Sequence, residues 1–419
     1  MKSFLYLRAA LPPLLALSLF ATSCTSPEDP PALPPTESPP SSPSTSLRLG
    51  IDVLAAENFA RIAGLRIALL THEAGRDAAG ARTLDRLAAA PNVRLVRVFA
   101  PEHGLASVLD GDVGDARDAA TGLPIHSLYG ATRRPPAELL RDIDALVVDL
   151  QDIGTRFYTY ITTLGYAMEE CARAGVRVIV LDRPNPLGGE LVDGPLVDAN
   201  KLRFIAYRPI PVVHGLTIGE LATYFNVEYS LGCTLEVVAM QGWRRDLRWT
   251  ETGIRWHNPS PNMRSATAAL LYPAIGLLEA CNLSVGRGTP SPFEIIGAPW
   301  IASERLADAM QAHALPGLGI APTDFTPSAS EFAGERCFGL RFTITDPALV
   351  EPIRTGLTLA WELRRIHADQ FDAARVLDRH LNSALHERWF SCDNPAALAP
   401  LWHATVEVFR RQRKPALLY

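Results

Sequence analysis

Short apolar runs alternate with helix-like segments through the first half of the chain. The runs are nearly continuous in β-branched residues or leucine, as expected for strands buried on both faces of a parallel sheet. They occupy residues 66–71, 93–100, 144–150, 176–182 and 234–240. The segments between them include 83–90, 137–142, 157–174 with Gly175 as its predicted C-terminal cap, and a helix opened by a capping box at Thr217–Glu220. The alternation predicts an α/β chain with a Rossmann-like, doubly wound parallel sheet in residues 47–248. The less regular pattern of residues 249–419, with a strong helix at 355–366, predicts a smaller α+β domain.

The first predicted strand is not followed by a dinucleotide-binding loop. It runs into Thr71-His-Glu-Ala-Gly75, which lacks the G-x-G-x-x-G spacing, so no dinucleotide cofactor is expected. The chain has no H-E-x-x-H and no recurring ligand spacing, so the sequence predicts no metal site and no cofactor. The cysteines after Cys24 include no C-x-x-C pair and support no disulfide framework.

Polar side chains follow each of the first four predicted strands. Ligands of open parallel sheets bind beyond the carboxyl ends of the strands, where loops and helix N-termini converge. Polar residues after a single strand would mean little, but polar residues after four successive strands favour a binding site over core packing. The residues concerned are His72, Glu73, Glu102, His103, Asp149, Gln151, Asp152, Arg156, Asp182, Arg183 and Asn185.

Glu102 and His103 are the sharpest candidates for catalysis. They lie on a short turn between Pro101 and Gly104, where a carboxyl can be held rigid and partly exposed, as a general acid requires. The alternative is a turn whose glutamate binds only backbone amides. Glycoside hydrolysis usually needs a second carboxylate. Asp149, Asp152 and Asp182 are candidates for it, although an aspartate after a strand is often a helix N-cap.

Candidate substrate-binding residues lie beside these carboxyls and in the second half of the chain. Arg156 and Arg183 offer forked donors for a carboxylate, or they hold loops by pairing with Asp149 or Asp152. Tyr158 and its aromatic neighbours could stack on a sugar or simply pack. Rigid loops at 257–263 and 286–294 carry Asn262 and Arg287 and suit a cleft between the two domains.

The N-terminus is typical of an exported protein. Residues 1–24 have a basic start, an apolar run too short to span a bilayer, and the sequence Ala-Thr-Ser-Cys24, which resembles a lipobox. We expect a signal peptide, lipidation of Cys24 and a membrane-anchored, periplasm-facing lipoprotein of the cell envelope. Residues 25–46 are rich in proline and serine and predict an extended tether. The net charge of -5 argues against nucleic acid as a partner.

Several strings in the chain resemble a known family over residues 48–419. They include G-I-D-V-L at Gly50, P-E-H-G at Pro101, Q-D-I-G-T-R-F-Y-T-Y at Gln151, L-D-R-P-N-P-L-G-G at Leu181, P-S-P-N-M at Pro259 and G-R-G-T at Gly286. Together these strings are similar to the NamZ-type exo-β-N-acetylmuramidases. The resemblance implies a Rossmann-like domain, a smaller C-terminal domain and an active site between them. It also implies metal-independent release of terminal N-acetylmuramic acid (MurNAc) from MurNAc–GlcNAc saccharides derived from peptidoglycan.

The resemblance also implies roles for particular residues. It makes Glu102 the main catalytic carboxyl with His103 beside it. It suggests cleft positions for Gln151, Asp152, Arg156, Tyr158, Asp182, Arg183, Asn185, Asn262 and Arg287. The chain departs from the family pattern at Val285, where a glutamate usually precedes G-R-G-T, and Glu73 could compensate. Two other readings remain open: a non-catalytic muropeptide-binding lipoprotein, and a hydrolase of another bond in the same cleft.

Overall fold

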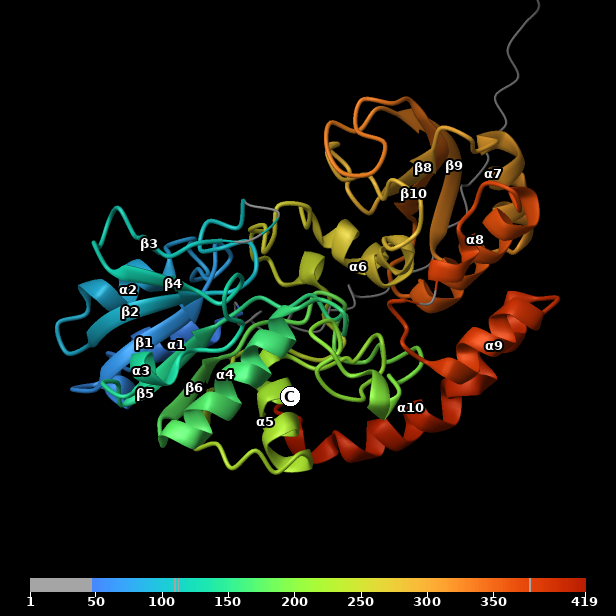
Figure 1. Cartoon of the computed structure of the whole chain (residues 1–419). Helices are drawn as coiled ribbons and strands as arrows, with labels where there is room; N and C mark the ends of the chain where they lie inside the picture. The colour runs from blue at the N-terminus through green and yellow to red at the C-terminus, as the bar shows by residue number, and fades with distance from the viewer. Residues whose placement is uncertain (1–46, 109–110, 112, 377) are drawn as a thin grey trace, which may run out of the picture. The chain divides into compact units, whose positions relative to one another are not determined.

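A computed structural model of the chain describes residues 47–108, 111, 113–376 and 378–419. Cys24, the predicted signal peptide and the predicted tether lie outside these residues. The first part of the fold is a seven-stranded sheet with the order β3-β4-β2-β1-β5-β6-β7, parallel except for the edge strand β3 (Figure 1). Its strands are β1 (Arg66–Thr71), β2 (Arg94–Ala100), β3 (Ala116–Arg117), β4 (Pro124–Ser127), β5 (Ala145–Asp149), β6 (Arg177–Leu181) and β7 (Leu235–Val238).

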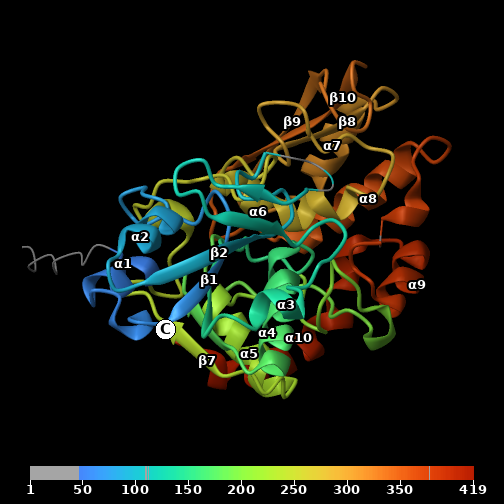
Figure 2. The ribbon, with the colours of Figure 1, turned by 60° about the vertical axis from the view of Figure 1, so that its left-hand side comes forward.

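Successive side chains of the strands enter two different apolar cores. Leu69 and Val147 pack on one face with α1 (Gly50–Ala56) and α2 (Thr83–Ala89). Leu70 and Val148 pack on the other face with α4 (Tyr160–Ala174) and α5 (Ile218–Glu228), and the short helix α3 (Ala137–Leu140) adjoins α4. Figure 2 shows α1 and α2 on one side of β1 and β2 and α4 and α5 on the other. The predicted doubly wound α/β sheet is confirmed.

The ends of two helices follow the predicted capping signals. Gly175 ends α4 with φ = 69°, a left-handed conformation that glycine adopts at little cost. Thr217 and Glu220 form the predicted capping box of α5. The start of α4 differs, because the helix begins at Tyr160 and not at residue 157. The backbone of Arg156 instead bonds to Val212, which keeps the residues before the helix in a loop.

The second part of the fold contains a three-stranded antiparallel sheet with the order β8-β10-β9. Its strands are β8 (Ile295–Ala298), β9 (Leu318–Phe325) and β10 (Cys337–Ile344), and the neighbouring helices are α6 (Ala266–Ile275), α7 (Ser303–Ala312) and α8 (Pro352–Ile366). The predicted helix at 355–366 is thus confirmed, with one more turn at its start. Proline fits that first turn because it has no N–H to leave unpaired there.

The end of the chain returns to the first sheet. After α9 (Ser383–Ser391), α10 (Pro400–Gln412) brings Phe409 edge-on to Tyr224, with ring centroids 5.3 Å apart. The hydroxyl of Tyr419 then donates to Asp182 at 2.7 Å. One apolar core also continues from Val148 of β5 to Leu340 of β10. The two sheets therefore share a core, and residues after 249 contribute to the surroundings of both. No helix in the described parts of the chain is long and apolar enough to cross a membrane.

Candidate active site

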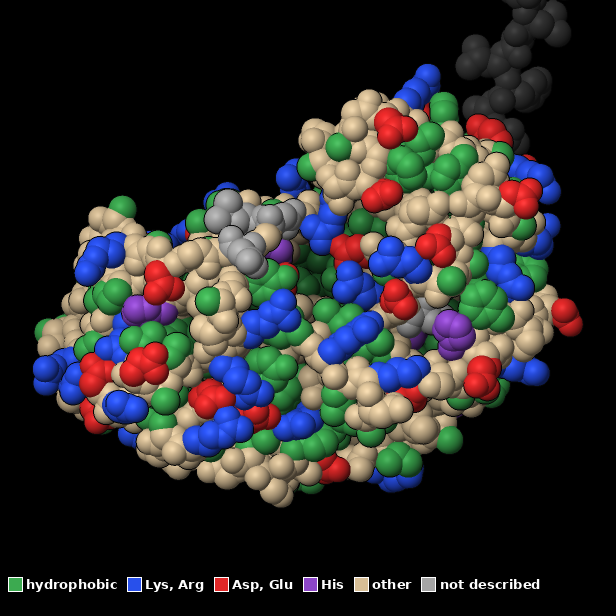
Figure 3. Space-filling model, viewed as in Figure 1, with side chains coloured by type: hydrophobic (Ala, Val, Ile, Leu, Met, Phe, Trp, Pro, Cys, Tyr) green, Lys and Arg blue, Asp and Glu red, His purple; other side chains and the backbone are tan. Residues whose placement is uncertain are grey.

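A cavity of about 740 Å³ lies where loops beyond the first sheet meet residues of the second part of the chain. Figure 3 shows it as a hollow with acidic and basic side chains around its rim. Glu102, His103 and Tyr158 come from loops of the first sheet, and Asn262 and Arg287 come from the second half. Five residues singled out from the sequence are therefore brought to one site.

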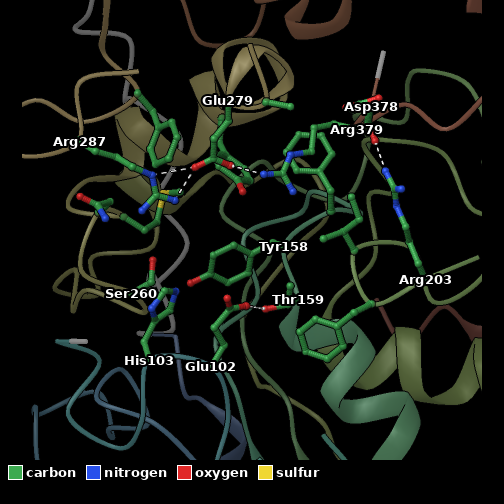
Figure 4. Close-up of a pocket in the computed structure, with 18 of the residues that line it drawn as sticks. Glu102, His103, Tyr158, Thr159, Arg203, Ser260, Glu279, Arg287, Asp378 and Arg379 are labelled. Atoms are coloured by element: carbon green, nitrogen blue, oxygen red, sulfur yellow. Dashed lines mark hydrogen bonds and ion pairs between the residues drawn. The ribbon is translucent and has the colours of Figure 1, made fainter. Parts of the chain in front are cut away.

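Glu102 is positioned by the end of β2 and the start of α4. It is the second residue after β2 and is half-buried, and its Oε2 accepts a hydrogen bond from the hydroxyl of Thr159 (Figure 4). Thr159 directly precedes α4, and a helix N-terminus stabilises a nearby negative charge. The sequence predicted this carboxyl on a constrained turn. The structure adds the donor that orients it.

The turn after Glu102 is held in a left-handed conformation. His103 has φ = 73° and Gly104 has φ = 74°. Such a φ costs little for glycine but is uncommon for histidine. A non-glycine residue keeps this conformation only where the surrounding structure holds it there. His103 lines the cavity beside Glu102.

Aromatic rings form an apolar part of the cavity wall. Tyr158 meets Tyr272 of α6 in a T-shaped contact at 6.1 Å, and Tyr272 meets Phe293 at 4.7 Å. Phe157 packs on Tyr272 at 5.1 Å. Burial raises the pKa of the Tyr158 hydroxyl well above its usual value, so this group stays protonated. A surface of this kind can pack against the face of a sugar ring.

On the opposite side, Glu279 lies between two arginines. Its Oε1 accepts from Nε of Arg287 at 2.8 Å, and its Oε2 accepts from Nη2 of Arg379 at 3.1 Å. Figure 4 shows the two guanidinium groups approaching Glu279 from opposite sides, across the cavity from Glu102. The cavity thus combines carboxylates, aromatic surface and cationic groups.

Asp182 lies away from this cavity. It is fully buried and accepts hydrogen bonds from the Thr217 hydroxyl at 2.8 Å, the Gly219 amide at 2.8 Å and the Tyr419 hydroxyl at 2.7 Å. Burial raises its pKa to about 6. Its neighbours are the first turn of α5 and the end of the chain. The structure therefore gives Asp182 a capping and anchoring position away from this cavity, which the sequence left open as an alternative.

Arg183 also points into the protein. Its guanidinium binds the buried carboxylate of Asp149 through two nitrogens, the second at 2.9 Å, and donates to the carbonyl of Arg76 at 2.6 Å. Of the two roles considered from the sequence, the pairing with Asp149 is the one that the structure shows. Such an ion pair fixes the loops after β1, β5 and β6 to one another.

Arg156 is completely buried and does not line the cavity. It donates to the carbonyl oxygens of Pro195 at 2.7 Å, Ile210 at 2.9 Å, Arg379 at 3.1 Å and His380 at 2.6 Å. Burial lowers its pKa to about 9. Arg156 therefore joins the loop before α4 to the segment that carries Arg379.

Gln151, Asp152 and Asn185 hold the same loops. Gln151 donates to the carbonyl of Pro184 at 2.9 Å, and Asn185 donates to that of Leu216 at 3.0 Å. The carboxylate of Asp152 accepts from the Gly154 amide at 2.7 Å and lies 3.2 Å from Nε2 of His214. None of the three lines the cavity.

Sequence reasoning did not find Glu279, Arg379 or Thr159 as site residues. Glu279 follows α6 in a segment without a motif, and Arg379 lies where no periodicity is evident. The signal for Thr159 was present, since it lies beside Tyr158 in the Gln151 motif. Glu73 forms an ion pair with Arg76 and does not line this cavity. Within the described residues, no three His, Cys, Asp or Glu side chains lie together in a way that could hold a metal ion.

Comparison with known proteins decides the family. The models of the N-terminal and C-terminal parts of the exo-beta-N-acetylmuramidase NamZ match residues 67–267 and 270–419. The chain belongs to the NamZ family. The peptidoglycan beta-N-acetylmuramidase NamZ of Bacillus subtilis (strain 168) is 39% identical over 378 residues, covering 89% of this chain and 91% of that protein.

Two solved structures resemble this NamZ-family chain. A DUF1343 family protein from Bacteroides fragilis superposes with a TM-score of 0.83 at 36% identity, covering 90% of this chain and all of that one. A second from the same organism gives a TM-score of 0.71 at 28% identity, covering 90% and 99%. The fold of this chain is thus shared with both solved structures.

Proposed function

We propose that the chain is an exo-acting glycosidase that releases MurNAc from the non-reducing ends of peptidoglycan fragments. The observation that carries the proposal is the position of Glu102, oriented by Thr159 in a cavity with aromatic and cationic walls. The activity named for the Bacillus relative supports the same reaction class. Its substrates would be MurNAc–GlcNAc saccharides.

Glu102 is the candidate general acid of this reaction. Cleavage breaks the bond between C1 of MurNAc and the glycosidic oxygen, and the elements of water are added across it. A carboxyl at Glu102 would give its proton to the departing oxygen, which lowers the barrier to bond breaking. Glu279 lies across the cavity from Glu102. Because its carboxylate accepts hydrogen bonds from two arginines, its first role is to hold those arginines in place.

Incubation of the purified chain with MurNAc–GlcNAc and with para-nitrophenyl MurNAc tests the proposal. We expect free MurNAc from both compounds, detected by mass spectrometry, and no cleavage of GlcNAc–MurNAc, which lacks a terminal MurNAc at the non-reducing end. Binding of MurNAc–GlcNAc without turnover would favour a muropeptide-binding protein instead. Loss of a group other than the sugar would favour a different hydrolase.

We also propose that the chain is an envelope lipoprotein anchored through Cys24. The support is the sequence alone: the basic start, the apolar run and the small residues before Cys24. The Pro/Ser-rich residues 25–46 would tether the enzyme to the membrane. A fatty-acid probe should label the wild type and not Cys24→Ala in growing cells. Equal labelling of both would contradict lipidation at this residue.

A further inference from the structure

We infer that Arg379 selects the substrate by binding the carboxylate of its lactyl group, with Glu279 and Arg156 as positioning residues. The inference deepens the proposed function and rests on it. MurNAc differs from GlcNAc by a lactyl ether that ends in a carboxylate, so an enzyme that prefers MurNAc needs a cation at the sugar site. No family motif noted in the sequence contains Arg379.

The guanidinium of Arg379 keeps donors that the protein does not use. Arginine has five N–H donors. Among the described residues, only Oε2 of Glu279 accepts a hydrogen bond from this side chain, through Nη2 at 3.1 Å, while Nε is buried without an acceptor. The side chain is 23% exposed and lines the cavity that contains Glu102. A ligand carboxylate can therefore reach a charged group whose hydrogen bonding is incomplete.

Arg379 is also held in place from behind. Arg156 donates to the carbonyl oxygens of Arg379 and His380 from a fully buried position, so the backbone at this point is fixed to the loop before α4. The same loop carries Thr159, the partner of Glu102. One connected set of hydrogen bonds thus sets the position of Arg379 relative to the catalytic carboxyl, and such preorganisation is what selective binding requires.

The other arginines of the cavity are engaged differently. Arg287 directs both Nε and Nη2 at one oxygen of Glu279. Arg133 stacks on the ring of Phe204 at 4.2 Å, and Arg203 donates to the carbonyl of Asp378 at 2.6 Å. Nε of Arg375 forms an ion pair with Oδ2 of Asp378 at 3.7 Å. Arg379 combines a cavity position and a fixed backbone with a single hydrogen bond to a carboxylate, which leaves its other donors available.

The test compares para-nitrophenyl MurNAc with its lactamide, in which an uncharged amide replaces the carboxylate. We expect full-length wild type to prefer the acid by about ten- to a hundredfold in kcat/KM, the range expected for a charge-assisted pair. Arg379→Gln should lose this preference because the acid loses the charge-assisted pair and slows much more than the lactamide does. The preference of Arg379→Lys for the acid should lie between those of the wild type and Arg379→Gln, since lysine keeps the charge without the forked geometry.

Arg388→Gln is the matched control, because Arg388 is exposed on α9 outside the cavity and the net charge changes equally. If Arg379→Gln slows both substrates equally, or keeps the preference for the acid, the inference is overturned. A second measurement needs no variant: free MurNAc should inhibit the wild type more tightly than its lactamide, and equal inhibition would also overturn it. A wild type that cleaves neither substrate would instead overturn the proposed function, and the inference with it.

Discussion

Glu102 receives a hydrogen bond from Thr159, so the candidate catalytic carboxyl at the end of β2 is oriented by the residue that precedes α4. The two residues are 57 positions apart in the sequence and meet because β2 ends and α4 begins at the same edge of the sheet. The contact therefore joins the fold to the proposed chemistry.

Removing this contact should slow turnover without unfolding the protein. Thr159→Val keeps the shape of the side chain but loses the hydroxyl, and we expect kcat to fall about tenfold because the carboxyl is less well oriented. Thr159→Ser keeps the hydroxyl and should stay within about threefold of the wild type. Steady-state kinetics with MurNAc–GlcNAc, whose leaving oxygen must be protonated, measures both. Equal losses for serine and valine would contradict the role of the hydroxyl.

Replacing Arg156 should lower stability. Its guanidinium donates to four carbonyl oxygens, and lysine cannot reach all of them. We expect Arg156→Lys to reduce the free energy of unfolding by at least about 2 kcal/mol, measured in urea. The exposed Arg388→Lys is the control. Unchanged stability in Arg156→Lys would show that these bonds are not needed.

The buried pair of Arg183 and Asp149 should behave as a unit. Arg183→Met leaves an unpaired buried carboxylate and should cost about 3–5 kcal/mol. Adding Asp149→Leu removes that charge, and much of the loss should be recovered. Urea unfolding of the single and double variants gives the coupling. Additive losses would show that the two groups do not stabilise each other.

His380 should make the fold less stable in acid. Burial lowers its pKa to about 3, so the folded state excludes a proton that the unfolded chain binds below its ordinary pKa of 6.5. Its contribution is fully present above pH 6.5 and is lost as pH falls towards 3. Asp182 acts in the opposite direction, because its raised pKa of about 6 favours folding as pH falls below 6. A comparison with a variant is therefore needed.

His380→Phe should remove this part of the pH dependence. Between pH 7.5 and pH 5 the wild type should lose about 2 kcal/mol more than the variant, at about 1.4 kcal/mol per pH unit below 6.5. Urea unfolding at the two pH values checks the difference. Parallel losses in the two proteins would mean that His380 is not buried in the neutral form.

The sequence was a good guide to the first sheet because strands buried on both faces carry a strong apolar signal. The five predicted strands and the end of α4 at Gly175 are present. The short strands β3 and β4 were missed, since two to four residues give no periodicity. The return of α10 to the first sheet was missed as well, because it depends on tertiary packing.

The sequence located the edge of the sheet where the site lies, but it did not separate the residues that face the cavity from those that hold the loops. Glu102 and Tyr158 face the cavity, whereas Asp182 and Arg183 point inward from equally polar strand ends. Side-chain direction at a strand end depends on neighbouring loops far away in sequence. Arg379 lines the cavity although it lies in no motif, because tertiary packing alone brings it to the site.

Turnover by Glu102→Gln tests the central claim most directly. The change is nearly isosteric in a half-buried side chain, so the protein should fold, as circular dichroism and thermal unfolding can verify. The control is Glu387→Gln, an exposed glutamate of α9. With MurNAc–GlcNAc, whose sugar leaving group needs a proton to depart, Glu102→Gln should lower kcat by at least about a hundredfold, and the control should match the wild type. Near-normal release of MurNAc by folded Glu102→Gln would contradict the account.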